Sequence, residues 1–208
     1  MTYESLLPGL RTGYDRAADE RDGAILEPWK SIERQRFLGK LKGERASTLL
    51  EIGSGPGVHA QFFQDEGLSV TCTDLSPELV ERCRRKGLTA FVMDFLHLDF
   101  PDRSFDAMFA MNCLLHVPRA DLQTALAAIG RPLRAGGLFY WGQYGGIDRE
   151  GVREDDHYVP KRFFSSLRDE DIKTEAQTAG FDVIDFHTVH HSNDAPIHYQ
   201  ALTLRKPR

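Results

Sequence analysis

Three glycines at alternate positions, Gly53, Gly55 and Gly57, are the residues whose spacing most directly indicates chemistry. They follow an apolar run, residues 48–52, that is typical of a buried parallel strand, and they precede residues 58–64, which predict a helix. Because glycine has no Cβ and adopts positive φ angles at no steric cost, a ligand can lie directly on such a turn. Strand, glycine turn and helix together predict the first half of a βαβ nucleotide-binding unit.

The glycine spacing favours one kind of cofactor over another. A dinucleotide-binding turn needs Gly or Ala three residues after its second glycine, so that the helix packs closely on the strand. That position is Val58 here, which argues against a nicotinamide cofactor. The next predicted strand, residues 68–73, is followed by Asp74, where a carboxylate can bind the two hydroxyls of a ribose. Alternatively, Asp74 only caps the helix that begins near Ser76.

Four segments, in order along the chain, resemble the motifs of class I S-adenosylmethionine-dependent methyltransferases of the small-molecule type. They are EIGSGPG from Glu51, TDLSPELVERC from Thr73, MDFLHLDFPDRSFDAMFAMNCLLHVP from Met93, and LRAGGLFYWGQYG from Leu133. The resemblance implies S-adenosylmethionine as cofactor. It also implies an α/β, Rossmann-like, doubly wound and mostly parallel sheet of seven strands in the order 3-2-1-4-5-7-6, with the last strand antiparallel.

The resemblance also implies where each part of the cofactor binds. The three glycines contact its methionyl part, and Asp74 binds the ribose hydroxyls. Leu75 covers one face of the adenine, Asp94 accepts from the adenine amino group, and the amide of Phe95 faces the ring. For Asp94 the alternative is a solvated carboxylate, because the loop that follows it is rich in acids.

Three further residues complete the cofactor site that we expect. By the same resemblance, Asn112, at the end of the fourth strand, lies near the amino acid end of the cofactor. Glu51 lies under the glycine turn and acts through water. Tyr14, in the N-terminal segment, covers the cofactor.

Two histidines are candidates for a catalytic base. A base helps methyl transfer when the acceptor must lose a proton, and histidine titrates near neutral pH. His116 follows the fourth strand on the ligand side, and His157 lies in a long connection that can reach the acceptor. The alternatives are that His116 only fills the start of the next helix and that His157 is an exposed loop residue.

Alternating strands and helices from residue 48 onward must position these side chains, since ligands of open α/β sheets bind outside the carboxyl ends of the strands. The pattern predicts an N-terminal helical cap over residues 1–43, with a helix at 27–41, and a cofactor-binding domain over residues 44–208. Residues 143–168 form a lid-like insertion, because connections of that length are uncommon without a binding role. Strands are expected at 48–52, 68–73, 89–93, 105–111, 138–142, 181–189 and 197–204, with a turn at 192–196 between the last two and a helix at 119–133.

Composition narrows the function classes further. The 208 residues carry a net charge of −5, which argues against nucleic-acid binding by bulk electrostatics. Three scattered cysteines and the lack of an N-terminal signal pattern or a long apolar run favour a cytoplasmic protein without a membrane span. Histidines at 187, 190, 191 and 198 lack an acid that would complete a metal site, so we expect no metal.

The sequence therefore predicts an enzyme that transfers a methyl group from S-adenosylmethionine to a small molecule by direct displacement. One alternative is methylation of protein or RNA, which the segment Met111-Asn112-Cys113-Leu114 disfavours because it lacks the Pro-Pro-aromatic sequence of such families. Another is a regulatory module that binds the cofactor without turnover. The acceptor, the methylated element and the oligomeric state are left open.

Overall fold

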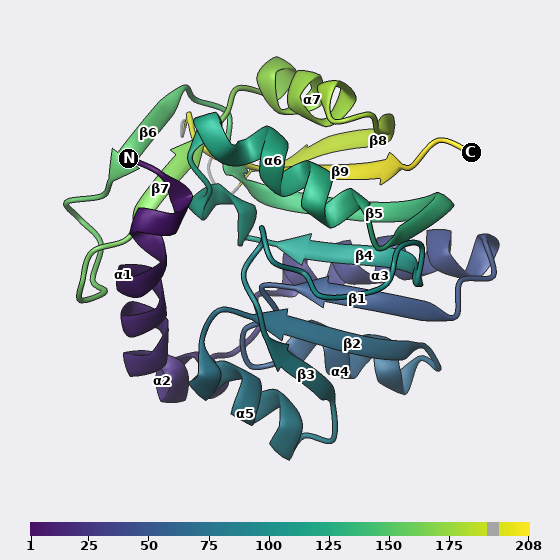
Figure 1. Ribbon diagram of the computed structural model, residues 1–208, viewed down its shortest axis with the longest axis horizontal. Coiled ribbons are helices and arrows are strands. Elements are labelled where there is room, and N and C mark those ends of the chain that lie inside the picture. The colour runs from purple at the N-terminus through teal and green to yellow at the C-terminus, as the bar shows by residue number, and fades with distance from the viewer. Residues whose placement is uncertain (191–195) are drawn as a thin grey trace.

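A seven-stranded sheet in the order β3-β2-β1-β4-β5-β9-β8 forms the centre of the computed structural model, which describes residues 1–190 and 196–208 (Figure 1). Strands β1 to β5 run parallel, and β9 is antiparallel to both of its neighbours. The strands are β1 (Thr48–Ile52), β2 (Ser69–Asp74), β3 (Thr89–Val92), β4 (Phe105–Met111), β5 (Leu133–Gly145), β8 (Asp182–Val189) and β9 (His198–Arg205). A separate hairpin pairs β6 (Arg149–Val152) with β7 (Phe163–Ser166).

Helices cover both faces of the sheet and create two hydrophobic cores. One core contains α3 (Pro28–Gly43), α4 (Val58–Asp65) and α5 (Pro77–Arg85), and the other contains α1 (Tyr3–Arg16), α6 (Arg119–Gly130) and α7 (Asp169–Thr178). Strand β4 contributes to both cores, because Ala107 and Phe109 face the first core while Met108 and Ala110 face the second. Successive strand residues point to opposite faces, so an apolar run can fill both cores.

The N-terminal helices lie at the edge of the sheet where the parallel strands end (Figure 1). The short α2 (Ala18–Asp22) is held to α5 by two ion pairs, Asp19 with Arg82 and Asp22 with Lys86, both at 2.5 Å. Near the start of α1, the amide of Tyr3 donates to a carboxylate oxygen of Asp121 on α6, at 2.6 Å. The cap is thereby fixed above the carboxyl ends of the strands.

The predicted sheet is confirmed, including its order and its antiparallel last strand, once the hairpin strands β6 and β7 are counted. The expected helix at 27–41 corresponds to α3, and Ser76 caps α5 as its Ser-Pro-Glu sequence predicts, with its hydroxyl accepting from the Leu79 amide at 3.2 Å. Within the described residues, no helix combines the length and apolar character that crossing a membrane requires. The division into a cap and a cofactor-binding domain stays a prediction.

Several predicted boundaries differ from the structure, most of them by one residue. The largest differences are that helix α6 ends at Gly130 rather than at residue 133 and that β5 begins at Leu133, with the turn glycine Gly136 at φ +76° inside the strand. Residues 143–168 hold the end of β5 and the β6–β7 hairpin, and their role as a lid-like insertion stays a prediction. Helices α1 and α2 lie within the predicted N-terminal helical cap but were not predicted individually. Residues 192–195 of the predicted turn lie outside the described residues.

Candidate functional site

The turn between β1 and α4, formed by Gly53, Gly55 and Gly57, is called the glycine cradle. Larger residues would fill the space that it leaves open. Gly53, Gly55 and Gly57 all have positive φ angles, between 57° and 82°. A Cβ on Gly53 would lie 2.4 Å from the Cβ of Cys113, and one on Gly57 would lie 2.6 Å from Leu88. Close packing and positive φ thus both require glycine at these two positions.

Asp74 at the end of β2 holds this turn in place. One carboxylate oxygen accepts from the Gly55 amide at 2.8 Å and the other from the Ser76 amide at 2.9 Å. Burial raises the pKa of Asp74, although the two amides oppose that effect. Each carboxylate oxygen can accept a second hydrogen bond beside the one from the backbone, so the side chain can still bind a ribose diol.

A cavity of about 190 Å³, the amino-acid cavity, opens beside the turn. Several of its lining residues have buried polar atoms without hydrogen-bond partners among the described residues. These atoms are Nε of Arg21, Oε2 of Glu51, Nδ1 of His59 and Oδ1 of Asn112. Buried polar atoms in folded proteins are nearly always hydrogen-bonded, so four in one cavity indicate a ligand with several polar groups. Donors from Arg21 and acceptors from Glu51 and Asn112 match the carboxylate and ammonium of an amino acid.

Burial sets the charges around this cavity. It raises the pKa of Glu51 well above its usual range, with Arg34 opposing the shift. It lowers the pKa of His59 to about 3, and the nearby cations Arg34 and Lys30 lower it further. An ammonium group next to Glu51 would restore the charged carboxylate by the same electrostatic rule.

A second cavity, the adenosine-side cavity, has a volume of only about 50 Å³ and continues from the glycine turn toward the end of β3. Asp74, Leu75 and Phe95 line it, as the resemblance implies for an adenosine site. The ring of Tyr3 lies stacked on Phe95 with 5.7 Å between the centroids, and its hydroxyl accepts from the Phe95 amide at 3.5 Å. Small-molecule sites are usually ~300 Å³ or larger, so adenosine can enter only if Tyr3 moves.

Asp94 is turned toward its own loop. Its carboxylate accepts from the Leu96 amide at 2.8 Å and contacts Nδ1 of His97 at 2.9 Å. It does not line the adenosine-side cavity, so its role toward adenine stays a prediction.

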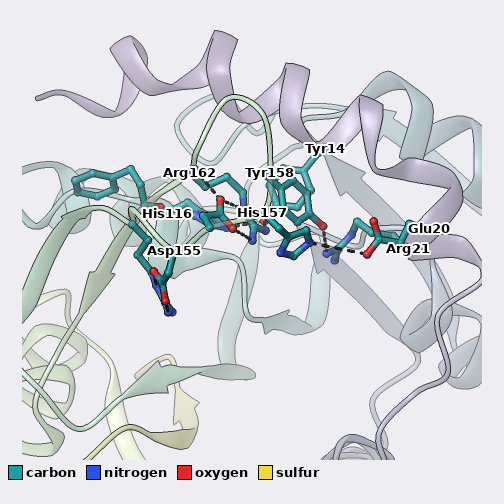
Figure 2. A network of polar contacts seen from close by, with 11 residues as sticks. Tyr14, Glu20, Arg21, His116, Asp155, His157, Tyr158 and Arg162 are labelled. Atoms are coloured by element: carbon teal, nitrogen blue, oxygen red, sulfur yellow. Dashed lines mark hydrogen bonds and ion pairs between the residues drawn. The ribbon is translucent and has the colours of Figure 1, made fainter.

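Tyr14 and His116 meet where the adenosine-side cavity reaches the end of β4 (Figure 2). Nδ1 of His116 lies 2.7 Å from the carbonyl oxygen of Phe163, and a carbonyl only accepts, so Nδ1 carries the proton. Nε2 is then the acceptor for the Tyr14 hydroxyl, at 2.6 Å. Burial lowers the pKa of His116 to about 3, which keeps the imidazole neutral at neutral pH.

Arg162 also belongs to this network and bonds to the same Tyr14 hydroxyl (Figure 2). Its Nη1 donates to the Tyr14 hydroxyl at 3.0 Å, and its guanidinium lies 3.5 Å above the ring of Tyr158. Asp156 accepts from Arg162 at 2.8 and 3.0 Å. Burial would raise the pKa of Asp156, but the bonds from Arg162 lower it to about 2. The ion pair therefore stays charged near neutrality and fixes the Tyr14 hydroxyl.

The structure does not bring His157 into either cavity. Its side chain is 69% exposed, with Nε2 3.9 Å from Glu20 and its ring against Tyr158 (Figure 2). A catalytic role for His157 stays a prediction, and the structure gives it no contact with the cofactor-site residues.

Arg21, His59, Tyr3 and Arg162 line or support the site although the sequence did not indicate them. Arg21 and Tyr3 belong to the N-terminal segment, whose residues follow no strand or glycine motif. Arg162 acts through contacts with residues more than 100 positions away in the chain, such as Tyr14. In the described part of the chain, no group of three or more His, Cys, Asp or Glu side chains is arranged to hold a metal ion.

Residues 49–137 match a protein family described as a methyltransferase domain. Demethylmenaquinone methyltransferase of Tropheryma whipplei (strain Twist) is 32% identical over 135 residues, which cover 62% of this chain and 56% of that protein. An S-adenosyl-L-methionine-dependent Diels-Alderase of Talaromyces variabilis is 34% identical over 122 residues, covering 53% of this chain and 41% of that protein. The chain spans about half the length of these curated relatives.

A solved structure shares the fold. It is 1,6-didemethyltoxoflavin-N1-methyltransferase of Burkholderia thailandensis, with bound 1,6-didemethyltoxoflavin and S-adenosylhomocysteine. Its TM-score is 0.65 at 21% identity, over 89% of this chain and 93% of that one. The family match, residues 49–137, runs from β1 into β5 and includes the glycine turn and Asp74. The chain is therefore similar to S-adenosylmethionine-dependent methyltransferases in the sequence of this segment and in its α/β fold.

Proposed function

We propose that this protein transfers the methyl group of S-adenosylmethionine to a small molecule. The observation that carries the proposal is the glycine cradle beside a cavity with unpartnered buried atoms of Arg21, Glu51, His59 and Asn112. That donor and acceptor set suits a zwitterionic amino acid joined to a nucleoside. The name of the Talaromyces relative and the S-adenosylhomocysteine bound in the Burkholderia structure support the same cofactor.

When bound, S-adenosylmethionine would supply a methyl group on a positively charged sulfur, and the sulfur would keep the bonding electron pair on transfer. Arg21 and His59 would hold the carboxylate of the amino acid, while Glu51 and Asn112 would hold its ammonium group. Asp74 would bind the ribose hydroxyls. The protein mainly aligns the reacting groups and excludes water, because the leaving group is already activated.

Tyr14 and His116 orient the acceptor. The Tyr14 hydroxyl donates to His116 and receives one hydrogen bond from Arg162, which leaves one lone pair free to accept from the acceptor. Since the pKa of His116 is about 3, it is a weak base at neutral pH, and a base works best near the operating pH. His116 therefore acts through Tyr14 as a positioning residue.

A small-molecule acceptor is favoured over RNA or protein. The net charge is −5, and the β4 end reads Met111-Asn112-Cys113-Leu114 without the Pro-Pro-aromatic segment. Cys72, Cys83 and Cys113 are free thiols, which fits a cytoplasmic location. A module that binds the cofactor without methyl transfer is the competing proposal.

Incubation of the protein with metabolite extract and methyl-labelled S-adenosylmethionine tests this proposal. We expect label in a low-molecular-mass product, identified by mass spectrometry. Label in RNA or protein would show that the acceptor is a macromolecule and not a small molecule. Cofactor binding without any label transfer would instead support a regulatory module, and an unlabelled new product would indicate a cycloaddition such as that named for the Talaromyces relative.

A further inference from the structure

A third cavity, the hairpin cavity, has a volume of about 290 Å³ and lies under the β6–β7 hairpin. Because side chains alternate along a strand, Arg149, Gly151 and Arg153 face it from β6 and its end, and Phe164 and Ser166 face it from β7. Gly151 pairs with Phe164, and a Cβ on Gly151 would meet nothing within 4 Å. The hairpin therefore presents two arginines separated by an open position.

Two arginines, Arg149 and Arg153, and no Asp or Glu line this cavity. Asp155, outside the lining, is paired with Arg153 at 3.0 Å from its Nε and also interacts electrostatically with Arg149. Among the described residues, Arg149 has no ion pair within 4.0 Å, so one carboxylate is shared between two arginines. Apolar side chains, chiefly Leu115, Ile147 and Ile197, form much of the remaining wall. Two arginines beside apolar walls suit a ligand with one anionic group and a hydrophobic body.

This cavity is next to the reacting end of the cofactor site. His116 lines the adenosine-side cavity, and its ring lies 4.9 Å from the ring of Phe164, which lines the hairpin cavity. Leu115, in the same 3-10 turn as His116, also lines the hairpin cavity. The side chains of His116, Leu115 and Phe164 thus lie where the two spaces adjoin, and an acceptor that displaces them would extend from the Tyr14 hydroxyl to Arg149.

We propose that the methyl acceptor is an amphipathic organic acid, whose carboxylate binds Arg149 and whose apolar body packs on Phe164, Ile147 and Ile197. A second polar group of the same molecule, a hydroxyl or an amine, donates a hydrogen bond to Tyr14 and receives the methyl group. The bond from the methyl carbon to sulfur breaks as the new bond forms, and the proton of the acceptor group is released to solvent. This inference rests on the proposed function, since it assigns the acceptor class of the same site.

Calorimetric titration with 2-naphthoate and with the neutral 2-naphthalenemethanol tests the inference, using the full chain saturated with S-adenosylhomocysteine. We expect 2-naphthoate to bind more tightly than the alcohol. Arg149→Gln should weaken 2-naphthoate about tenfold or more, as loss of a charged hydrogen bond does, and should leave the alcohol unchanged. Arg149→Lys, which keeps the charge, should recover part of the affinity.

Arg85→Gln is the matched control, because Arg85 is exposed on α5 beside the β3 edge of the sheet and far from the hairpin (Figure 1). It removes the same charge and should not change 2-naphthoate binding. Equal affinities of acid and alcohol, no binding of the acid, or equal losses in the two glutamine variants would overturn the assignment. The proposed function fails separately, if S-adenosylhomocysteine itself does not bind the unaltered chain.

Discussion

At the scale of single residues, the site depends on polar atoms that the protein buries without satisfying. Arg21 illustrates this, because its guanidinium lies 3.5 Å from the position that a Cβ on Gly55 would take, with its Nε unpartnered. Such an arginine costs stability unless a ligand completes its hydrogen bonds. Its position in the amino-acid cavity leads to a specific prediction.

Arg21→Met should weaken S-adenosylhomocysteine binding by about tenfold to a hundredfold, because charged hydrogen bonds contribute ~1.5–3 kcal/mol. Adenosine, which lacks the amino acid, should bind the variant as well as it binds the unaltered protein. Calorimetry with both ligands measures the difference. Arg11→Met, an exposed position on α1, is the control, and equal losses for both ligands would remove Arg21 from the carboxylate site.

His116 makes stability depend on pH. Burial lowers its pKa from 6.5 to about 3, so the unfolded chain binds a proton between these values that the folded chain does not. Stability is therefore full above pH ~6.5 and falls as the pH drops toward 3, by ~2 kcal/mol between pH 6.5 and 5 for this one group. His116→Gln should remove that part of the slope in urea unfolding.

Tyr14→Phe is the control for this measurement. It removes the hydrogen bond to His116 but keeps the buried imidazole, so it should lower stability at every pH and retain the slope. The same slope in His116→Gln as in the unaltered protein would show that His116 is not the titrating group.

The cofactor residues stay predictions, but the sequence places some of them at strand ends and leaves the surroundings of others undetermined. The positions of Gly53, Gly57 and Asp74 at the carboxyl ends of β1 and β2 can be predicted from their spacing after two apolar runs. Asp94 was expected to face the adenine, and its bond to His97 arises from the local turn, which spacing does not determine. The role of Arg21 requires knowing how the N-terminal segment folds over the sheet.

At the scale of elements, helix α1 covers the adenosine side, because Tyr3, Leu10 and Tyr14 line that cavity. Tyr3 is only 1% exposed and its ring lies on Phe95 where adenine is expected. The sequence did not reveal this helix, because Pro8 and Gly9 lie inside it and favour other structures. Its position comes from tertiary contacts to α5 and α6 rather than from its own propensity.

Tyr3→Ala should therefore bind S-adenosylhomocysteine several-fold more tightly while unfolding more easily, by about 3 kcal/mol for loss of a buried aromatic ring. The gain arises because the ligand no longer displaces the ring. Calorimetry and urea unfolding measure the two effects, with Tyr3→Phe as the variant that keeps the ring. Weaker binding by Tyr3→Ala would mean that Tyr3 supports the cofactor instead of excluding it.

At the scale of the whole molecule, the sheet was predictable and the acceptor side was not. Buried parallel strands such as β1 and β4 are short apolar runs, and Gly53 follows β1 directly, so the order of elements is visible in the sequence. The β6–β7 hairpin alternates polar and apolar residues only weakly, and its strands have four residues each. Its pairing depends on contacts with η1 (Leu114–His116) and α6, which only the folded chain provides.

The central claim is that the glycine cradle, Asp74 and the unpartnered atoms of the neighbouring cavity together bind S-adenosylmethionine. Calorimetric titration of the full chain with S-adenosylhomocysteine, repeated with excess NAD, tests it most directly. The account predicts one-to-one binding in the micromolar range that NAD does not diminish and that Asp74→Ala weakens. No heat of binding, or displacement of the ligand by NAD, would contradict it.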